Sequence, residues 1–166
     1  SSDSDSSSSD TPQALPAKVD GMVMATMPRS VLTNNTVDAF VESAKQAGAN
    51  ACVIELKDST GSLNFPVDHP IAAAAGNVAV NPIDIKTVTA QLREAGLEPV
   101  GLIHAFRDYQ SYRGAPDAYV RYAPNPDMSW LDNSKEKGGK AWLNPYSPDA
   151  HRYIIDMAKE LADAGF

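Results

Sequence analysis

The chain has 166 residues, enough for about one domain, and its 43% hydrophobic residues can form a real core. A formal net charge of −7 argues against nucleic acid or an anionic membrane as the main partner. The single cysteine, Cys52, excludes an internal disulfide framework and a cysteine-cluster metal site, and no apolar run approaches the roughly 18 residues of a membrane span.

The chain begins with a segment that has nothing to bury. Residues 1–10 are seven serines and three aspartates, and two prolines follow before residue 20. No burial offsets the entropy of ordering such a sequence. We predict that residues 1–19 form a flexible tether, of the kind that holds an exported domain away from a membrane or wall anchor upstream. A terminus without a role is an equal alternative, and export is inferred from the tether because no signal peptide is visible.

A strand–helix unit recurs from residue 20 to residue 166. Short apolar runs predict three buried strands, at Gly21–Met27, Ala51–Leu56 and Val100–Phe106. The amphipathic segments between and after them predict three helices that end at similar glycines, Gly48, Gly96 and Gly165.

Each predicted helix has a start signal and an apolar face. The first is capped by Asn35 or Thr36, the second opens at Asn81–Pro82, and the third opens at Ser147–Pro148. The faces expected to be buried are Val37, Phe40, Val41 and Ala44 in the first helix, Ile85, Val88 and Leu92 in the second, and Ile154, Met157, Ala158 and Leu161 in the third.

This alternation predicts an α/β fold with a parallel sheet covered by helices and with successive strands side by side. Three βα units predict the first part of a larger α/β protein; a complete (β/α)8 barrel needs about 250 residues, so a barrel would be less than half present in this chain. A fourth strand is therefore expected after Phe166, and without it the third strand has an unpaired edge.

Ligands of such folds bind beyond the carboxyl ends of the strands. At the second strand, alternation places Glu55 and Lys57 on one face, with Asp58 just beyond. Carboxylates there can orient sugar hydroxyls or act as acid and base. The alternative is a Glu–Lys or Asp–Arg ion pair that closes the rim of the sheet.

The third strand ends in two further candidates. His104 can hydrogen bond a substrate or titrate near neutrality, or it can be a structural group. Arg107 can clamp a carboxylate or stabilise a loop. His69 and His151 lack the spacing of metal ligands, and Gly138–Gly139 follows a charged turn instead of a strand. We therefore predict no metal site and no cofactor.

Two long connections follow the second and third strands, at 59–80 and 107–146. The second carries both tryptophans and five of the six tyrosines of the chain. Long loops at this end of a sheet are usually functional or disordered, and this aromatic content disfavours disorder. We predict exposed aromatic rings that stack on sugars; the alternative is that they cover the barrel without a ligand.

Three segments resemble a family of mostly uncharacterised bacterial glycoside hydrolases of (β/α)8-barrel type, exported or anchored at the cell surface. They are Val53–Phe65 (VIELKDSTGSLNF), Pro99–Asp108 (PVGLIHAFRD) and Lys140–Phe166, which begins KAWLNPYSP. The family pattern has V-I-D-V-K-D-D-S-G, a strand continuing into F-K-D, and A-W-V-D-P-Y-N. The likeness covers roughly residues 21–166, with gaps in the loops. It implies that the chain is the N-terminal portion, about three βα units, of a (β/α)8 TIM-like barrel.

The resemblance carries over position by position. Lys57 and Asp58 match, Glu55 stands for the family's Asp, and Arg107 and Asp108 stand for its Lys-Asp. Trp142 and Pro145–Tyr146 also match, whereas Asn144 replaces an Asp and cannot act as an acid or base. The family continues after A-G-F with a strand ending F-D-Y-V-R-F-P, whose acid is the expected second carboxylate of a hydrolytic pair roughly 5–10 Å apart.

These observations predict the N-terminal part of an exported, extracellular or surface-anchored glycoside hydrolase that acts on a polysaccharide or cell-surface glycan and is inactive as this chain alone. Asp58 and Glu55 are the predicted catalytic acids. The predicted substrate-binding residues are Lys57, His104, Arg107, Asp108, Trp142 and Asn144. The alternative is a carbohydrate-binding or scaffolding protein without turnover. A deacetylase ranks last because the His-rich metal spacing is missing.

Overall fold

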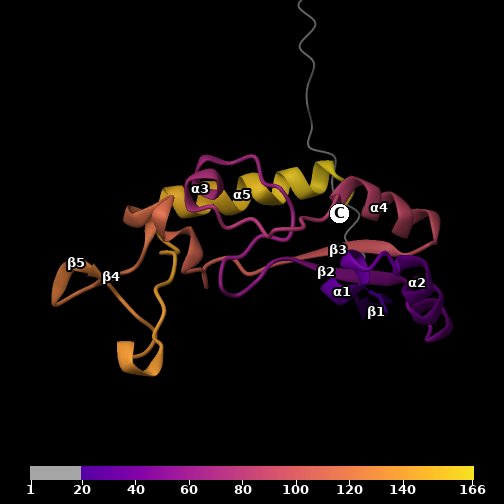
Figure 1. Cartoon of the computed structure of the whole chain (residues 1–166), viewed down its shortest axis with the longest axis horizontal. Coiled ribbons are helices and arrows are strands. Elements are labelled where there is room, and N and C mark those ends of the chain that lie inside the picture. Colours follow the sequence, from indigo (N-terminus) through magenta and orange to yellow (C-terminus); the bar gives the residue numbers. More distant parts are fainter. Residues whose placement is uncertain (1–19) are drawn as a thin grey trace, which may run out of the picture.

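A computed structural model describes residues 20–166 as a mixed α/β structure with a parallel three-stranded sheet (Figure 1). The strands are β1 (Met24–Thr26), β2 (Ala51–Lys57) and β3 (Glu98–Ile103), in the order β1-β2-β3. The predicted adjacency and parallel direction of successive strands are confirmed. The predicted tether at 1–19 lies outside the described residues.

The three predicted helices are present and end as expected. They are α2 (Val37–Gln46), α4 (Ile85–Glu94) and α5 (Pro148–Asp163). Each is followed by a glycine with positive φ, at 86° for Gly48, 82° for Gly96 and 108° for Gly165. Left-handed backbone at this position closes the last helical turn at little cost only in glycine, so the repeated Ala-Gly pairs are helix stops.

Two details of the helices were predicted wrongly. The helix α4 begins at Ile85 instead of Asn81–Pro82, because the Asp84 side chain accepts a hydrogen bond of 3.1 Å from the Thr87 N–H and caps the helix there. In α5 the buried face includes Tyr153, which is fully buried, whereas Ala158 is exposed. Tyr153 was missed as a core residue in the sequence analysis because its side chain carries a polar hydroxyl group.

Strand limits also differ from those predicted. The strand β1 covers only Met24–Thr26, and β3 ends at Ile103, so residues 104–106 already belong to the connection that follows. Two short helices that apolar periodicity did not indicate, α1 (Arg29–Thr33) and α3 (Pro70–Ala75), lie in the connections after β1 and β2.

The hydrophobic core is organised around β2. Its buried Cys52, Ile54 and Leu56 alternate with the partly exposed Val53 and Glu55, and the buried set belongs to one cluster with residues of α2, α4 and α5. None of the described helices is both long and apolar enough to cross a membrane.

The long connection after β3 contains several short helices and strands. It contains the 3-10 helices η1 (Gln110–Arg113), η2 (Pro116–Ala118) and η3 (Lys135–Lys137), and the hairpin strands β4 (Arg121–Tyr122) and β5 (Asn125–Ser129). Figure 1 shows the hairpin at the left end of the molecule, beyond the first turn of α5. Since β3 leads into this connection, the hairpin projects past the carboxyl end of the sheet.

Candidate functional site

A carboxylate and an imidazole meet at the carboxyl end of the sheet. Glu55 comes from β2, and His104 follows β3 directly. The Oε2 atom of Glu55 lies 3.2 Å from the Nε2 atom of His104, and the two side chains are 44% and 37% exposed. The pair is accessible and can exchange a proton with a bound molecule.

The neighbouring Lys57 is placed differently from the prediction. A register shift between Glu55 and Lys57 interrupts the pairing of β2 with β3. The Lys57 side chain is fully buried, and its Nζ atom lies 3.1 Å from the Oδ2 atom of Asp108. It also donates to the main-chain oxygen atoms of His104 at 2.5 Å and Ala105 at 3.5 Å. The pairs formed are thus Glu55–His104 and Lys57–Asp108, and neither is the Glu–Lys or Asp–Arg pair considered as the alternative.

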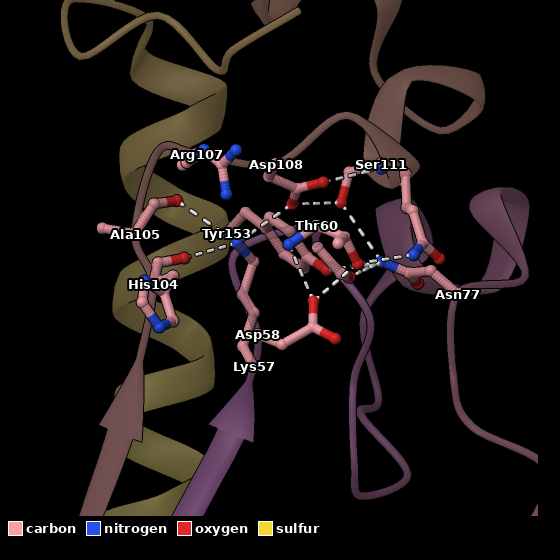
Figure 2. Close-up of polar contacts among 12 residues, drawn as sticks. Lys57, Asp58, Thr60, Asn77, His104, Ala105, Arg107, Asp108, Ser111 and Tyr153 are labelled. Carbon is pink, nitrogen blue, oxygen red and sulfur yellow. Dashed lines mark hydrogen bonds and ion pairs between the residues drawn. The ribbon is translucent and has the colours of Figure 1, made fainter. Parts of the chain in front are cut away.

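Asp108 is the centre of a buried polar cluster (Figure 2). Its carboxylate accepts hydrogen bonds from the Ser111 N–H at 2.9 Å and the Ser111 hydroxyl at 2.6 Å. The Asn77 amide donates to the Gly61 carbonyl at 2.8 Å and to Ser111 at 3.2 Å. Burial lowers the pKa of Lys57, and the charge of Asp108 opposes that shift. This cluster joins the connections that follow β2 and β3.

Gly61 shows how closely the two connections approach. A Cβ atom at this position would lie 1.8 Å from Oδ1 of Asp108, and the φ of Gly61 is +98°. Only glycine fits both the space and the backbone conformation.

Asp58 closes a tight turn. Its Oδ1 atom accepts hydrogen bonds from the Thr60 N–H at 2.8 Å, the Thr60 hydroxyl at 2.6 Å and the Ser62 N–H at 3.1 Å. Burial raises the pKa of the Asp58 carboxyl, but these hydrogen bonds outweigh it and the net shift is downward. The carboxylate therefore favours its charged form and has an evident structural task.

A third polar group lies around Trp142 and contains an acid that sequence reasoning missed. The Oδ2 atom of Asp132 accepts a 3.0 Å hydrogen bond from the Trp142 indole, and Oδ1 accepts one of 2.7 Å from the Lys140 N–H. These bonds lower the pKa of Asp132, and the charge of Arg107 adds to the effect. The Arg107 guanidinium also donates to the Ser59 carbonyl at 3.4 Å.

Asn144 and Asn64 have main-chain partners. The Asn144 side chain accepts a 2.9 Å hydrogen bond from the Tyr146 N–H, in the turn before α5. Asn64 was also missed: its amide donates to the Glu55 carbonyl at 2.8 Å, and the Arg29 guanidinium donates to its side-chain oxygen. Asn64 thus holds the main chain beneath Glu55. No sequence signal marked it, because its partners come from β2 and from α1, which are separate in the sequence.

Within residues 20–166, no three His, Cys, Asp or Glu side chains are grouped so that they could hold a metal ion. The predicted site residues thus fall into an accessible pair (Glu55, His104), a buried pair (Lys57, Asp108), two turn-forming side chains (Asp58, Asn144) and a group at Arg107 and Trp142.

Comparisons with known proteins show the family to which the chain belongs. Residues 25–166 match the sequence model of the DUF4015 family, described as "Putative glycosyl hydrolase domain". The chain belongs to this family. The match agrees with the resemblance to glycoside hydrolases seen in the sequence.

The fold also resembles a solved structure, the crystal structure of a hypothetical protein from Ruminiclostridium thermocellum ATCC 27405. The TM-score is 0.72 at 24% sequence identity, and the match covers 87% of this chain and 72% of the other. At that identity the likeness concerns the fold alone. A search of curated proteins gave no match.

Proposed function

We propose that this chain is the N-terminal part of an exported glycoside hydrolase with a (β/α)8 barrel, and that Glu55 and His104 lie at its reaction centre. The observation that carries the proposal is the accessible Glu55–His104 pair, 3.2 Å apart at the carboxyl end of parallel strands. Membership of a glycosyl hydrolase family supports the same reaction class.

Among the acids predicted at the rim, Glu55 is best suited to proton transfer. Asp58 is held by three hydrogen bonds, and Asp108 is fully buried against Lys57. In the proposal Glu55 exchanges a proton with the glycosidic oxygen or with a water, and His104 orients its carboxylate. Glycoside hydrolysis normally uses two carboxylates, so we assign the second to residues following Phe166.

The other predicted residues divide by accessibility. Arg107 and Trp142 are assigned to substrate contact, whereas Lys57 and Asp108 are assigned to support of the rim, since neither has exposed surface. The proposed substrate is a polysaccharide or cell-surface glycan, with the protein outside the cell or anchored at its surface.

A carbohydrate-binding protein without turnover is the second candidate. One observation favours it: Asp58 is held in a turn by hydrogen bonds and Asp108 is buried against Lys57, so Glu55 is the one acid of the three suited to proton transfer.

The test compares this 166-residue chain with the longer protein of which we propose it is a part, on chromogenic aryl glycosides and dyed polysaccharides. We expect the longer protein to release dye and the short chain to release none. Glu55→Gln in the longer protein should lower the rate about a hundredfold or more, because a proton donor is lost. Glu42→Gln, at an exposed site on α2, is the matched control.

Hydrolysis by the short chain, or full activity of Glu55→Gln, would contradict the proposal. Glycan binding by the longer protein without any hydrolysis would select the second candidate.

A further inference from the structure

Three segments of the long connection pair into a small ladder beyond the sheet. The Val120 N–H donates to the Trp142 carbonyl at 3.0 Å, and the Trp130 N–H donates to the Val120 carbonyl at 2.8 Å. Antiparallel bridges join Tyr119 to Leu143 and Leu131 to Ala141. Each of the three segments, at Tyr119–Val120, Trp130–Leu131 and Ala141–Leu143, therefore pairs with both of the others.

The ladder has a buried face and an open face. Residues directly opposite on antiparallel strands share a face, and successive residues alternate. Tyr119 and its partner Leu143 are 1% and 0% exposed, so their face packs on the core. Ala141 is two residues from Leu143 and so shares its face, as does Leu131, which is bridged to Ala141. Val120, Trp130 and Trp142 are each adjacent to one of these residues, so their side chains lie on the opposite, open face.

Side-chain contacts agree with this assignment. Asp132 lies two residues after Trp130 and so shares its face, and it accepts the hydrogen bond from the Trp142 indole. Trp130 is 39% exposed. We call the open surface formed by Val120, Trp130, Asp132 and Trp142 the tryptophan face.

The chemistry of this face, and its continuity with the rim of the sheet, suit an extended sugar polymer. The Leu131–Ala141 bridge makes Trp130 and Trp142 opposite neighbours on paired segments, with Cβ atoms about 5 Å apart, so the two indoles lie next to each other on this face. Aromatic rings offer apolar surface at low conformational cost, and the Asp132 carboxylate beside the Trp142 indole adds an acceptor for sugar hydroxyl groups. The fixed carboxylate disfavours a lipid surface, because a charge there would have to leave water.

The tryptophan face continues into the rim of the sheet. The Leu143 N–H donates to the Phe106 carbonyl at 2.9 Å, which joins the Trp142 strand to the segment between His104 and Arg107. In Figure 1 the β4–β5 hairpin extends this ladder away from the sheet. A polymer lying on the face would thus lead toward Glu55 and His104.

We infer that the tryptophan face is a binding site for an extended polysaccharide chain, which it holds by stacking sugar rings on Trp130 and Trp142. The inference rests on the proposed function and deepens it, because it names the surface that holds the polysaccharide chain beside the proposed reaction centre.

Affinity electrophoresis of the 166-residue chain tests the inference without relying on hydrolysis. The gels contain xylan, mixed-linkage β-glucan, galactomannan or polygalacturonate. We expect at least one polymer to retard the chain, and Trp130→Leu and Trp142→Leu to weaken that binding about tenfold each, as loss of a central aromatic contact does. Trp130→Phe keeps a ring and should retain most of the affinity.

Tyr146→Leu is the matched control, because Tyr146 is a 91% exposed aromatic residue off the tryptophan face. Thermal melting of every variant checks folding. If Trp130→Leu fails to fold, Asp132→Ala replaces it, and about threefold weaker binding is expected from loss of one hydrogen bond.

The inference is overturned if no polymer retards the chain. It is also overturned if folded Trp130→Leu and Trp142→Leu, or the replacement variant Asp132→Ala, bind the polymer with unchanged affinity. Failure of the proposed function has a different signature: the short chain binds polymer, but the longer protein cleaves nothing. If the longer protein cleaves aryl glycosides but the short chain binds no polymer, the proposed hydrolase function stands and the tryptophan face is rejected as a binding site.

Discussion

Two pairs of a carboxylate and a basic group lie side by side at the carboxyl end of the sheet and differ mainly in exposure. Glu55–His104 is 44% and 37% exposed, whereas Lys57–Asp108 is 0% exposed on both sides. Both pairs connect β2 to the segment after β3. The comparison teaches that residue type and strand position do not decide what a charged pair does; access to water and to a ligand does.

The buried pair is suited to stabilising the fold. Few competing water molecules reach it, and its polar atoms are bonded to Ser111 and to the His104 and Ala105 carbonyls. Removing one partner leaves the other charge without compensation. The accessible pair contributes little to stability, because solvent screens it, but it can react.

The largest expected effect comes from breaking the buried pair. Asp108→Ala should lower the free energy of unfolding by about 3–5 kcal/mol, because Lys57 would be left buried without its carboxylate. Urea unfolding measures the change. Asp149→Ala, at an exposed ion pair on α5, is the control and should change stability by about 1 kcal/mol at most. A loss that small in Asp108→Ala would refute the contrast between the two pairs.

An intermediate effect is expected at Asp58. Asp58→Ala removes hydrogen bonds to Thr60 and Ser62 and should cost about 1–2 kcal/mol at neutral pH. The folded pKa of Asp58 lies below its ordinary value of 3.8, so its ionic stabilisation is present above that pH and is lost as the pH falls through the folded pKa.

Urea unfolding of wild type and Asp58→Ala from neutral to acidic pH checks this sign. The difference between them should stay constant down to about pH 4 and then shrink. A difference that grows with acidity would contradict the turn-forming role.

The smallest effect on stability is expected at the accessible pair. Glu55→Gln should change the free energy of unfolding by about 0.5 kcal/mol or less, since the contact to His104 is solvent-exposed. Thermal and urea unfolding measure it. His104→Gln should behave alike, and a loss above about 2 kcal/mol in either variant would show that the accessible pair, too, mainly stabilises the fold.

Local signals sufficed for much of the fold. Apolar periodicity and the Ala-Gly stops located α2, α4 and α5, and the apolar run at Ala51–Leu56 correctly marked the buried strand β2. Alternation could not give the partner of Lys57, because a register shift follows Glu55 and the partner Asp108 arrives from another connection.

The sequence predicted where the candidate site lies better than it predicted which side chains contact one another there. Strand ends pointed to Glu55 and His104, and their contact is in the structure. Exposure of the loop aromatics was only partly predicted: Trp130 is exposed, but Tyr119 is buried. Asp132 was missed in the sequence analysis because its hydrogen-bond partner, Trp142, lies in another segment. A signal was available: the patterns Trp-x-Asp and Lys-x-Trp, on paired strands, place Trp130, Asp132 and Trp142 on one face.

The single cysteine has a practical consequence. Cys52 is fully buried in the central strand, and burial raises the pKa of its thiol to about 11. A protonated, enclosed sulfur reacts slowly with alkylating reagents. The rate at which an alkylating reagent labels this sulfur therefore measures how often the middle of the sheet opens.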